Sequence, residues 1–167
     1  GMRAGVRPRS VVDMELLLAL RVEVLAHVSA ERRSEGSEGA WGELREANRR
    51  YYERELTREG HIGCVAEVGG EIAGCGGVCL YEEMPSPDNG SGKCGYLMNI
   101  YTREPYRRQG IGKTVCEWLI REARARGVEK IYLETSADAR ALYRGLGFSD
   151  MKDYMKLAED AGHGAEP

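Results

Sequence analysis

The sequence lacks the features that mark several large classes of protein. Its 24 Lys and Arg against 27 Asp and Glu leave a net charge of −3, without the basic excess that nucleic-acid binders usually carry. Its most apolar run, 14–25, is interrupted by three charged residues and falls well short of the ~20 apolar residues of a membrane span. No signal-peptide pattern precedes this run. We therefore expect a cytoplasmic protein with neither a nucleic-acid nor a membrane partner.

Cysteine and histidine are present but not in the patterns that bind metals or form disulfide frameworks. None of the five cysteines lies in a CxxC motif, and the nearest approach is Cys75-x-x-x-Cys79. An odd number cannot pair completely within one chain, so we expect reduced thiols. His27, His61 and His163 have no ligand spacing to one another or to a cysteine. We expect no metal site.

The composition that remains is that of an ordinary globular domain. Hydrophobic residues make up 42 % and charged residues 31 % of the 167 positions. A chain of this length is expected to form one domain with a substantial core. We place that domain at 3–157 and predict that the polar segment 158–167 is a disordered tail.

The first third of the chain has helical periodicity. Ser10 and Asp13 fit a capping box, which predicts a helix that opens at Ser10 and continues through Val28. The polar segment 29–39 contains two glycines and predicts a loop. From 41 to 56 the apolar residues recur every three or four positions, which predicts a second helix with one buried face.

The pattern changes to strands at residue 61. Two apolar runs in 61–81 flank Gly69-Gly70 and predict a hairpin. Strands are also expected at 94–102, 130–135 and 153–157, separated by helices that end near residues 126 and 147. The order predicts an α+β fold in which the later strand–helix–strand part needs parallel pairing.

The stretch "YRRQGIGKT", 106–114, resembles several phosphate-binding motifs. A P-loop would need glycine where Arg107 stands, and a dinucleotide fingerprint would need glycine where Val115 stands. Arg107-x-x-Gly110-x-Gly112 instead matches the [QR]-x-x-G-x-[GA] signature of acyl-CoA-dependent N-acetyltransferases. Glycines here let the backbone approach a pyrophosphate, which the free amides and dipole of the following helix attract.

A second motif supports this reading. The stretch "ETSADARALYRGLGF", 134–148, resembles the helix with L-Y-x-x-L-G-F that follows a strand in the GNAT superfamily of N-acetyltransferases. The strand, P-x-Y-R turn and helix of "YLMNIYTREPYRRQGIGKTV" are also similar, and the resemblance runs from about residue 3 to 157. It implies a GNAT-like fold, with a mixed central sheet of about six to seven strands flanked by about four helices.

The resemblance also implies which residues contact acetyl-CoA, the expected co-substrate. The end of the strand would bind the pantetheine arm, and the turn and helix start would bind the pyrophosphate. Ser136 stands where many relatives have asparagine, and its hydroxyl can still form a hydrogen bond. The expected contacts are Ile100, Tyr101, Thr102, Arg107, Arg108, Gln109, Gly110, Ile111, Gly112, Lys113, Thr114, Ser136, Arg140 and Tyr143.

The resemblance implies acetyl transfer to an amine by direct attack. Tyr143 matches the family tyrosine that protonates the departing thiolate. The glutamate that some relatives carry on the strand before the turn is replaced by Met98-Asn99, so the base is open among Glu134, Glu83 and Glu82. Because of this replacement, an alternative function is left open: a catalytically degenerate acyl-CoA-binding sensor or partner module.

The acceptor cannot be chosen from the sequence. A small amine, amino acid, drug, peptide N-terminus or protein lysine all fit the resemblance. Family members are often dimers, so a homodimer is also left open.

Overall fold

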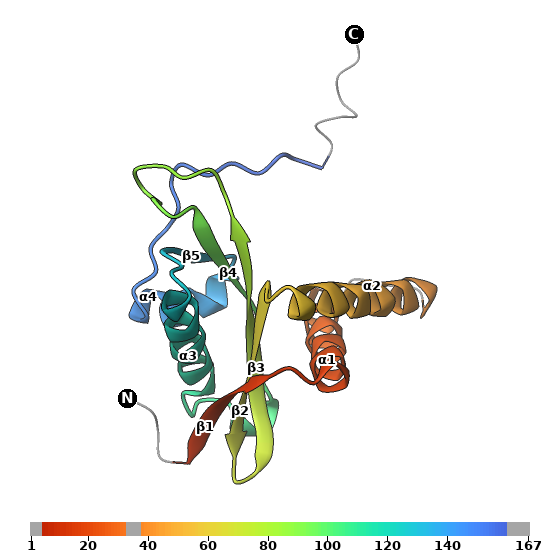
Figure 1. The fold of residues 1–167 in the computed structure, drawn as a ribbon. Coiled ribbons are helices and arrows are strands. Elements are labelled where there is room, and N and C mark those ends of the chain that lie inside the picture. The colour runs from red at the N-terminus through yellow and green to blue at the C-terminus, as the bar shows by residue number, and fades with distance from the viewer. Residues whose placement is uncertain (1–4, 33–37, 160–167) are drawn as a thin grey trace.

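The structure, a computed structural model, describes residues 5–32 and 38–159 (Figure 1). The middle of the expected loop 29–39 and most of the expected tail 158–167 lie outside these residues. Within them, no helix is long and apolar enough to cross a membrane.

Five strands form one mixed sheet in the order β1-β2-β3-β4-β5. Neighbours from β1 to β4 are antiparallel, whereas β4 and β5 are parallel. The α+β prediction with a parallel pair late in the chain is confirmed, but the expected six to seven strands were too many for the described residues. The strands are β1 Val6–Val11, β2 His61–Val68, β3 Glu71–Glu82, β4 Lys93–Thr102 and β5 Lys130–Leu133.

The missing strand is the one expected at 153–157. This segment has no strand structure, and Met155 and Leu157 are 98 % and 82 % exposed. Tyr154 packs on Tyr132 of β5, with 6.1 Å between ring centroids, but no strand among the described residues pairs with this segment. The strand prediction for 153–157 was therefore wrong.

The first helix begins later than predicted. Ser10 lies in β1, where it pairs with Cys64, so it cannot cap a helix. Asp13 is the cap instead: its Oδ1 accepts hydrogen bonds from the backbone N–H groups of Glu15 (3.0 Å) and Leu16 (3.3 Å). The prediction of a capping box at Ser10 was wrong because Ser10 pairs with a strand that is distant in sequence.

Four helices cover the two faces of the sheet (Figure 1). The orange helices α1 and α2 lie on one face, and the teal α3 lies on the other with the blue α4 beside it. Each face has its own buried apolar cluster, one around Leu20 and Tyr52 and one around Val115 and Leu119. The helices are α1 Met14–Arg32, α2 Glu38–Thr57, α3 Ile111–Ala125 and α4 Arg140–Gly145, with short 3-10 turns at Glu104–Tyr106 and Ala137–Ala139.

Two parts of the sheet contain residues with positive φ. Gly69 and Gly70 have φ values of 59° and 82°, as the predicted tight hairpin requires. In β4 the register shifts between the pairs Gly77–Met98 and Cys75–Tyr101, and Asn99 within this bulge has φ 60°. Bulges of this kind redirect side chains near functional sites.

Candidate active site

A cleft of about 640 Å³ lies where β4 and β5 part. The two strands pair only as far as Leu97 and Leu133, after which β4 continues to Thr102 and β5 ends. The end of β4, the beginning of α3, the segment after β5 and α4 together line the cleft. Beyond Leu97 the end of β4 has no strand partner on the β5 side among the described residues, which leaves backbone groups there for a ligand.

One wall of the cleft is the N-terminus of α3. Gly110 precedes the helix with φ 77°, and no side chain caps it. The first helical bond runs from the N–H of Thr114 to the carbonyl of Gly110 (3.0 Å), so the three preceding amides have no helical partner. Arg107, Arg108 and Lys113 add positive charge on the same wall. The arrangement suits a diphosphate.

Most of the sequence-predicted site residues line this cleft together. They come from four separate segments, which only the fold brings within one cavity. They are Ile100, Tyr101, Thr102, Arg107, Arg108, Gly110, Ile111, Gly112, Lys113, Glu134, Ser136 and Tyr143.

Five predicted residues, Glu82 among them, do not line it. Thr114 is buried behind the helix start, and the Gln109 amide donates to the carbonyl of Pro105 (3.5 Å). Glu83 accepts from Lys130, with its Oε2 3.1 Å from Nζ, away from the cleft. Arg140 forms an ion pair with Asp150. A side chain already paired in this way is less available to a phosphate or an amine.

Tyr143 lies at the wall between this cleft and a second cavity. Its side chain is 9 % exposed and packs edge-on against Phe148, with 6.0 Å between ring centroids. No described residue hydrogen-bonds its hydroxyl. Burial raises the pKa of Tyr143 to about 12. The phenol therefore keeps its proton throughout the physiological pH range.

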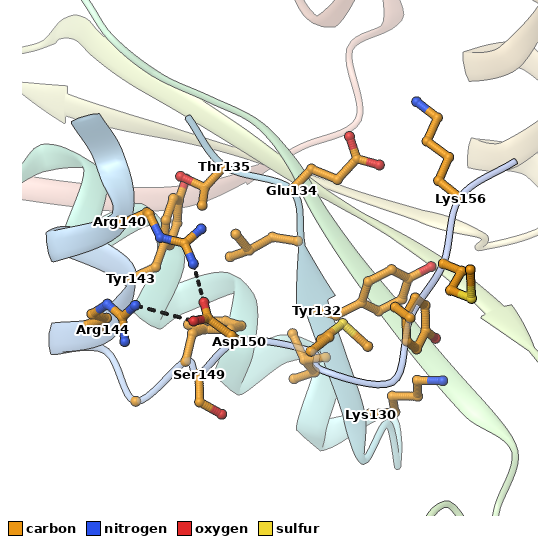
Figure 2. Close-up of a pocket in the computed structure, with 17 residues that line it drawn as sticks. Lys130, Tyr132, Glu134, Thr135, Arg140, Tyr143, Arg144, Ser149, Asp150 and Lys156 are labelled. Atoms are coloured by element: carbon orange, nitrogen blue, oxygen red, sulfur yellow. Dashed lines mark hydrogen bonds and ion pairs between the residues drawn. The ribbon is translucent and has the colours of Figure 1, made fainter. Parts of the chain in front are cut away.

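The second cavity is larger, about 870 Å³, and lies against β5 and the C-terminal segment (Figure 2). Figure 2 shows Arg140 and Arg144 directed at Asp150, whose carboxylate partly neutralises the positive charge of the two arginines. Glu134 and Thr135 line both cavities. Of the two, the smaller cleft contains the uncapped start of α3 and is therefore better suited to a phosphate group.

Sequence reasoning missed a third cavity of about 260 Å³ on the α1 and α2 side of β4. It shares Arg21, Met98 and Asn99 with the cleft. Arg21 appeared in the sequence only as one interruption of an apolar run. Its partners Asn48 and Asn99 are 27 and 78 residues away in sequence, so no local pattern could have connected them.

Comparison with known proteins shows to which family the chain belongs. The family described as "Acetyltransferase (GNAT) family" matches residues 26–148, which include the cleft and its motifs. The chain belongs to the GNAT acetyltransferase family. It is thus an acetyl-CoA-dependent N-acetyltransferase by family, as the resemblance at residues 106–114 and 134–148 predicts.

Individual relatives agree with this assignment. The chain is 27 % identical over 112 residues to glucosamine 6-phosphate N-acetyltransferase of Arabidopsis thaliana. The matched segment covers 66 % of this chain and 73 % of that protein. A shorter match of 57 residues, 44 % identical, is to the [ribosomal protein bS18]-alanine N-acetyltransferase of Escherichia coli strain K12, and covers 32 % of this chain and 38 % of the relative. The matched parts thus leave substantial portions of both relatives uncovered.

A solved structure confirms the fold. The crystal structure of a predicted acetyltransferase with acetyl-CoA from Clostridium acetobutylicum superimposes with a TM-score of 0.80, covers 96 % of this chain and 99 % of that one, and is 24 % identical. At this identity the likeness establishes the GNAT fold. The roles of single residues and the identity of the acceptor must be inferred from the side chains of this chain.

Proposed function

We propose that the chain transfers the acetyl group of acetyl-CoA to an amine, with Tyr143 as the general acid. The observation that carries the proposal is that one cleft joins the uncapped start of α3 to Tyr143. The amides of α3 and the charges of Arg107, Arg108 and Lys113 suit the pyrophosphate. The end of β4, from Ile100 to Thr102, suits the pantetheine arm.

Acetyl transfer by direct attack forms one bond and breaks one. The neutral amine attacks the thioester carbonyl carbon, an N–C bond forms and the C–S bond breaks. The thiolate takes the phenolic proton of Tyr143, and the amine nitrogen loses one proton to water or to a base. Backbone N–H groups at the bulged end of β4 are suited to stabilise the oxyanion. The raised pKa of Tyr143 keeps the phenol protonated at neutral pH and makes it a weaker acid than a free tyrosine, so proton transfer depends on the thiolate being held beside the hydroxyl.

Glu134 is the carboxylate we propose as base, acting through water. It lines the cleft beside Thr135, whereas Glu83 is ion-paired with Lys130 outside it. Glu82, at the end of β3, does not line the cleft either. A base that acts through water accelerates the step when the amine is largely protonated, so its contribution is greatest near neutral pH.

The test is release of free thiol from acetyl-CoA in the presence of a library of amines. Tyr143→Phe should lower kcat by roughly 10²- to 10⁴-fold while leaving acetyl-CoA binding within a few fold, because the ring still fills its place. Tyr154→Phe is the matched control, since Tyr154 is 53 % exposed and outside the cleft. Equal rates for wild type and Tyr143→Phe would remove Tyr143 from the mechanism.

The alternative function, acyl-CoA binding without turnover, has one observation in its favour. Asn99 stands on β4 where some relatives carry a glutamate, and its amide is engaged with Arg21. Binding of acetyl-CoA with no thiol release across the whole amine library would favour this alternative over the enzyme.

A further inference from the structure

Arg21 is a cation that the proposed acetyl transfer leaves without a role. It extends from α1 to the point where the cleft and the 260 Å³ cavity adjoin. Its Nε donates to Asn48 Oδ1 (3.1 Å) and its Nη1 donates to Asn99 Oδ1 (3.0 Å). Asn48 is itself fixed, because its amide nitrogen donates to the carbonyl of Leu44 (2.9 Å). The guanidinium is therefore held in one orientation by neutral groups.

No carboxylate among the described residues pairs with Arg21. The nearby arginines differ: Arg103 binds Glu23 (2.9 Å) and Arg49 binds Glu15 (2.8 Å). No described residue accepts a hydrogen bond from Nη2 of Arg21 either. A half-buried guanidinium with its charge uncompensated and donors available is a site for an oxyanion.

The charge of Arg21 reaches into the small cavity. Burial raises the pKa of Tyr52 to about 12, and the positive charge of Arg21 opposes that rise. Burial also lowers the pKa of His61 to about 4, so His61 stays neutral and does not compete for the anion. Arg21 is thus the one charged side chain among the residues that line this cavity.

The rest of the cavity is small and mostly apolar. Ala47, Tyr51, Tyr52, Cys79 and Met98 form most of its wall. At about 260 Å³ it is just below the usual range of sites for drug-sized ligands, roughly 300–1,000 Å³. It therefore suits an apolar side chain of a few carbon atoms, with an oxyanion at its opening.

We infer that the acceptor is a small amine that carries an oxyanion, bound by Arg21, and an apolar side chain, bound in this cavity. A free apolar α-amino acid has this chemistry, and an amine with a phosphate shares the anionic part. The inference rests on the proposed acetyl transfer, since it names the acceptor of the same site. It assigns Arg21, Asn48 and Asn99 to acceptor recognition.

The experiment compares amines in matched pairs, using the full chain and thiol release from acetyl-CoA. Leucine is paired with isoamylamine and phenylalanine with phenethylamine, so that each pair differs by a carboxylate. Phosphoethanolamine paired with ethanolamine tests phosphate instead. We expect kcat/KM to be roughly 10- to 100-fold higher for the anionic member of the preferred pair, because one charge-assisted interaction is added.

Arg21→Gln should remove this preference. It should lower kcat/KM for the anionic amine by a much larger factor than kcat/KM for its neutral partner. Arg21→Lys keeps the charge without the planar fork and should retain part of the preference. Arg45→Gln is the control, because Arg45 is an exposed arginine of α2 outside both cavities.

The outcomes separate this inference from the proposed function. Equal kcat/KM within every pair, or equal losses for both members in Arg21→Gln, would overturn the inference while acetyl transfer stands. If no amine is acetylated, thermal unfolding with leucine or phosphoethanolamine alone provides a second readout. Thermal stabilisation of the wild type that Arg21→Gln abolishes would then support oxyanion binding, although the proposed acetyl transfer would be lost. No stabilisation of the wild type would overturn both the inference and the proposed function. The wild-type pairs remain decisive should Arg21→Gln not fold.

Discussion

At the scale of single residues, His61 shows how burial sets a charge state. Its side chain is 8 % exposed, its Nδ1 lies 2.7 Å from the Tyr51 hydroxyl, and its ring lies against Gly77. Burial lowers the pKa of His61 from 6.5 to about 4, partly opposed by the charge of Glu55. The folded chain therefore binds fewer protons at this position than the unfolded chain between these two values.

This difference predicts that stability falls as pH falls. From pH 6.5 down to about 4, His61 should cost up to about 3 kcal/mol of unfolding free energy, because the unfolded state gains the proton first. Above pH 6.5 the contribution is constant. Denaturant unfolding across pH 4 to 8 measures it, as the difference between wild type and His61→Gln. A difference that does not vary with pH would contradict a buried neutral imidazole.

At the scale of secondary-structure elements, close packing of α3 on β3 supports the cleft. Gly76 is buried, and a Cβ there would lie 2.6 Å from both Ile100 Cδ1 and Val115 Cγ1 and 3.1 Å from Leu119 Cδ1. Contacts this short from three directions leave no room for a methyl group unless α3 or Ile100 moves. Ile100 also lines the cleft, so packing and ligand binding are linked here.

Gly76→Ala should therefore destabilise the fold by roughly 1–3 kcal/mol and weaken acetyl-CoA binding. Gly42→Ala is the matched control, because Gly42 lies inside α2 with open space around its Cα. That control should be stabilised by up to about 1 kcal/mol through helix propensity. Denaturant unfolding and acetyl-CoA titration of both variants measure these effects. Equal stability of the two variants would show that α3 yields freely.

Elements with local signals were predictable from the sequence, and those with distant partners were not. The turn from Arg107 to Gly112 and the hairpin at Gly69-Gly70 follow from glycines that their backbone conformations require. The predictions of a helix start at Ser10 and of a strand at 153–157 were wrong for the same reason, because neighbours across the sheet determine whether a segment forms a strand. Ser10 has a partner in β2, whereas 153–157 has none among the described residues.

At the scale of the whole molecule, the fold brings two kinds of site to the strand β4. The cleft with the start of α3 lies where β4 leaves β5, and the small cavity lies on the side of β4 that faces α1 and α2. Arg21 and the bulge at Asn99 stand between them. This connection could not be predicted from the sequence, because it joins helices and strands from both faces of the sheet.

Thermal unfolding with acetyl-CoA, CoA, ATP and NAD in parallel shows whether the cleft at 106–114 binds acetyl-CoA. At a ligand concentration of ~100 times Kd, linkage predicts stabilisation of about 2.7 kcal/mol. For a chain of this size that raises Tm by roughly 5–10 °C. We expect this rise with acetyl-CoA and CoA alone. A rise with ATP or NAD and none with acetyl-CoA would contradict it.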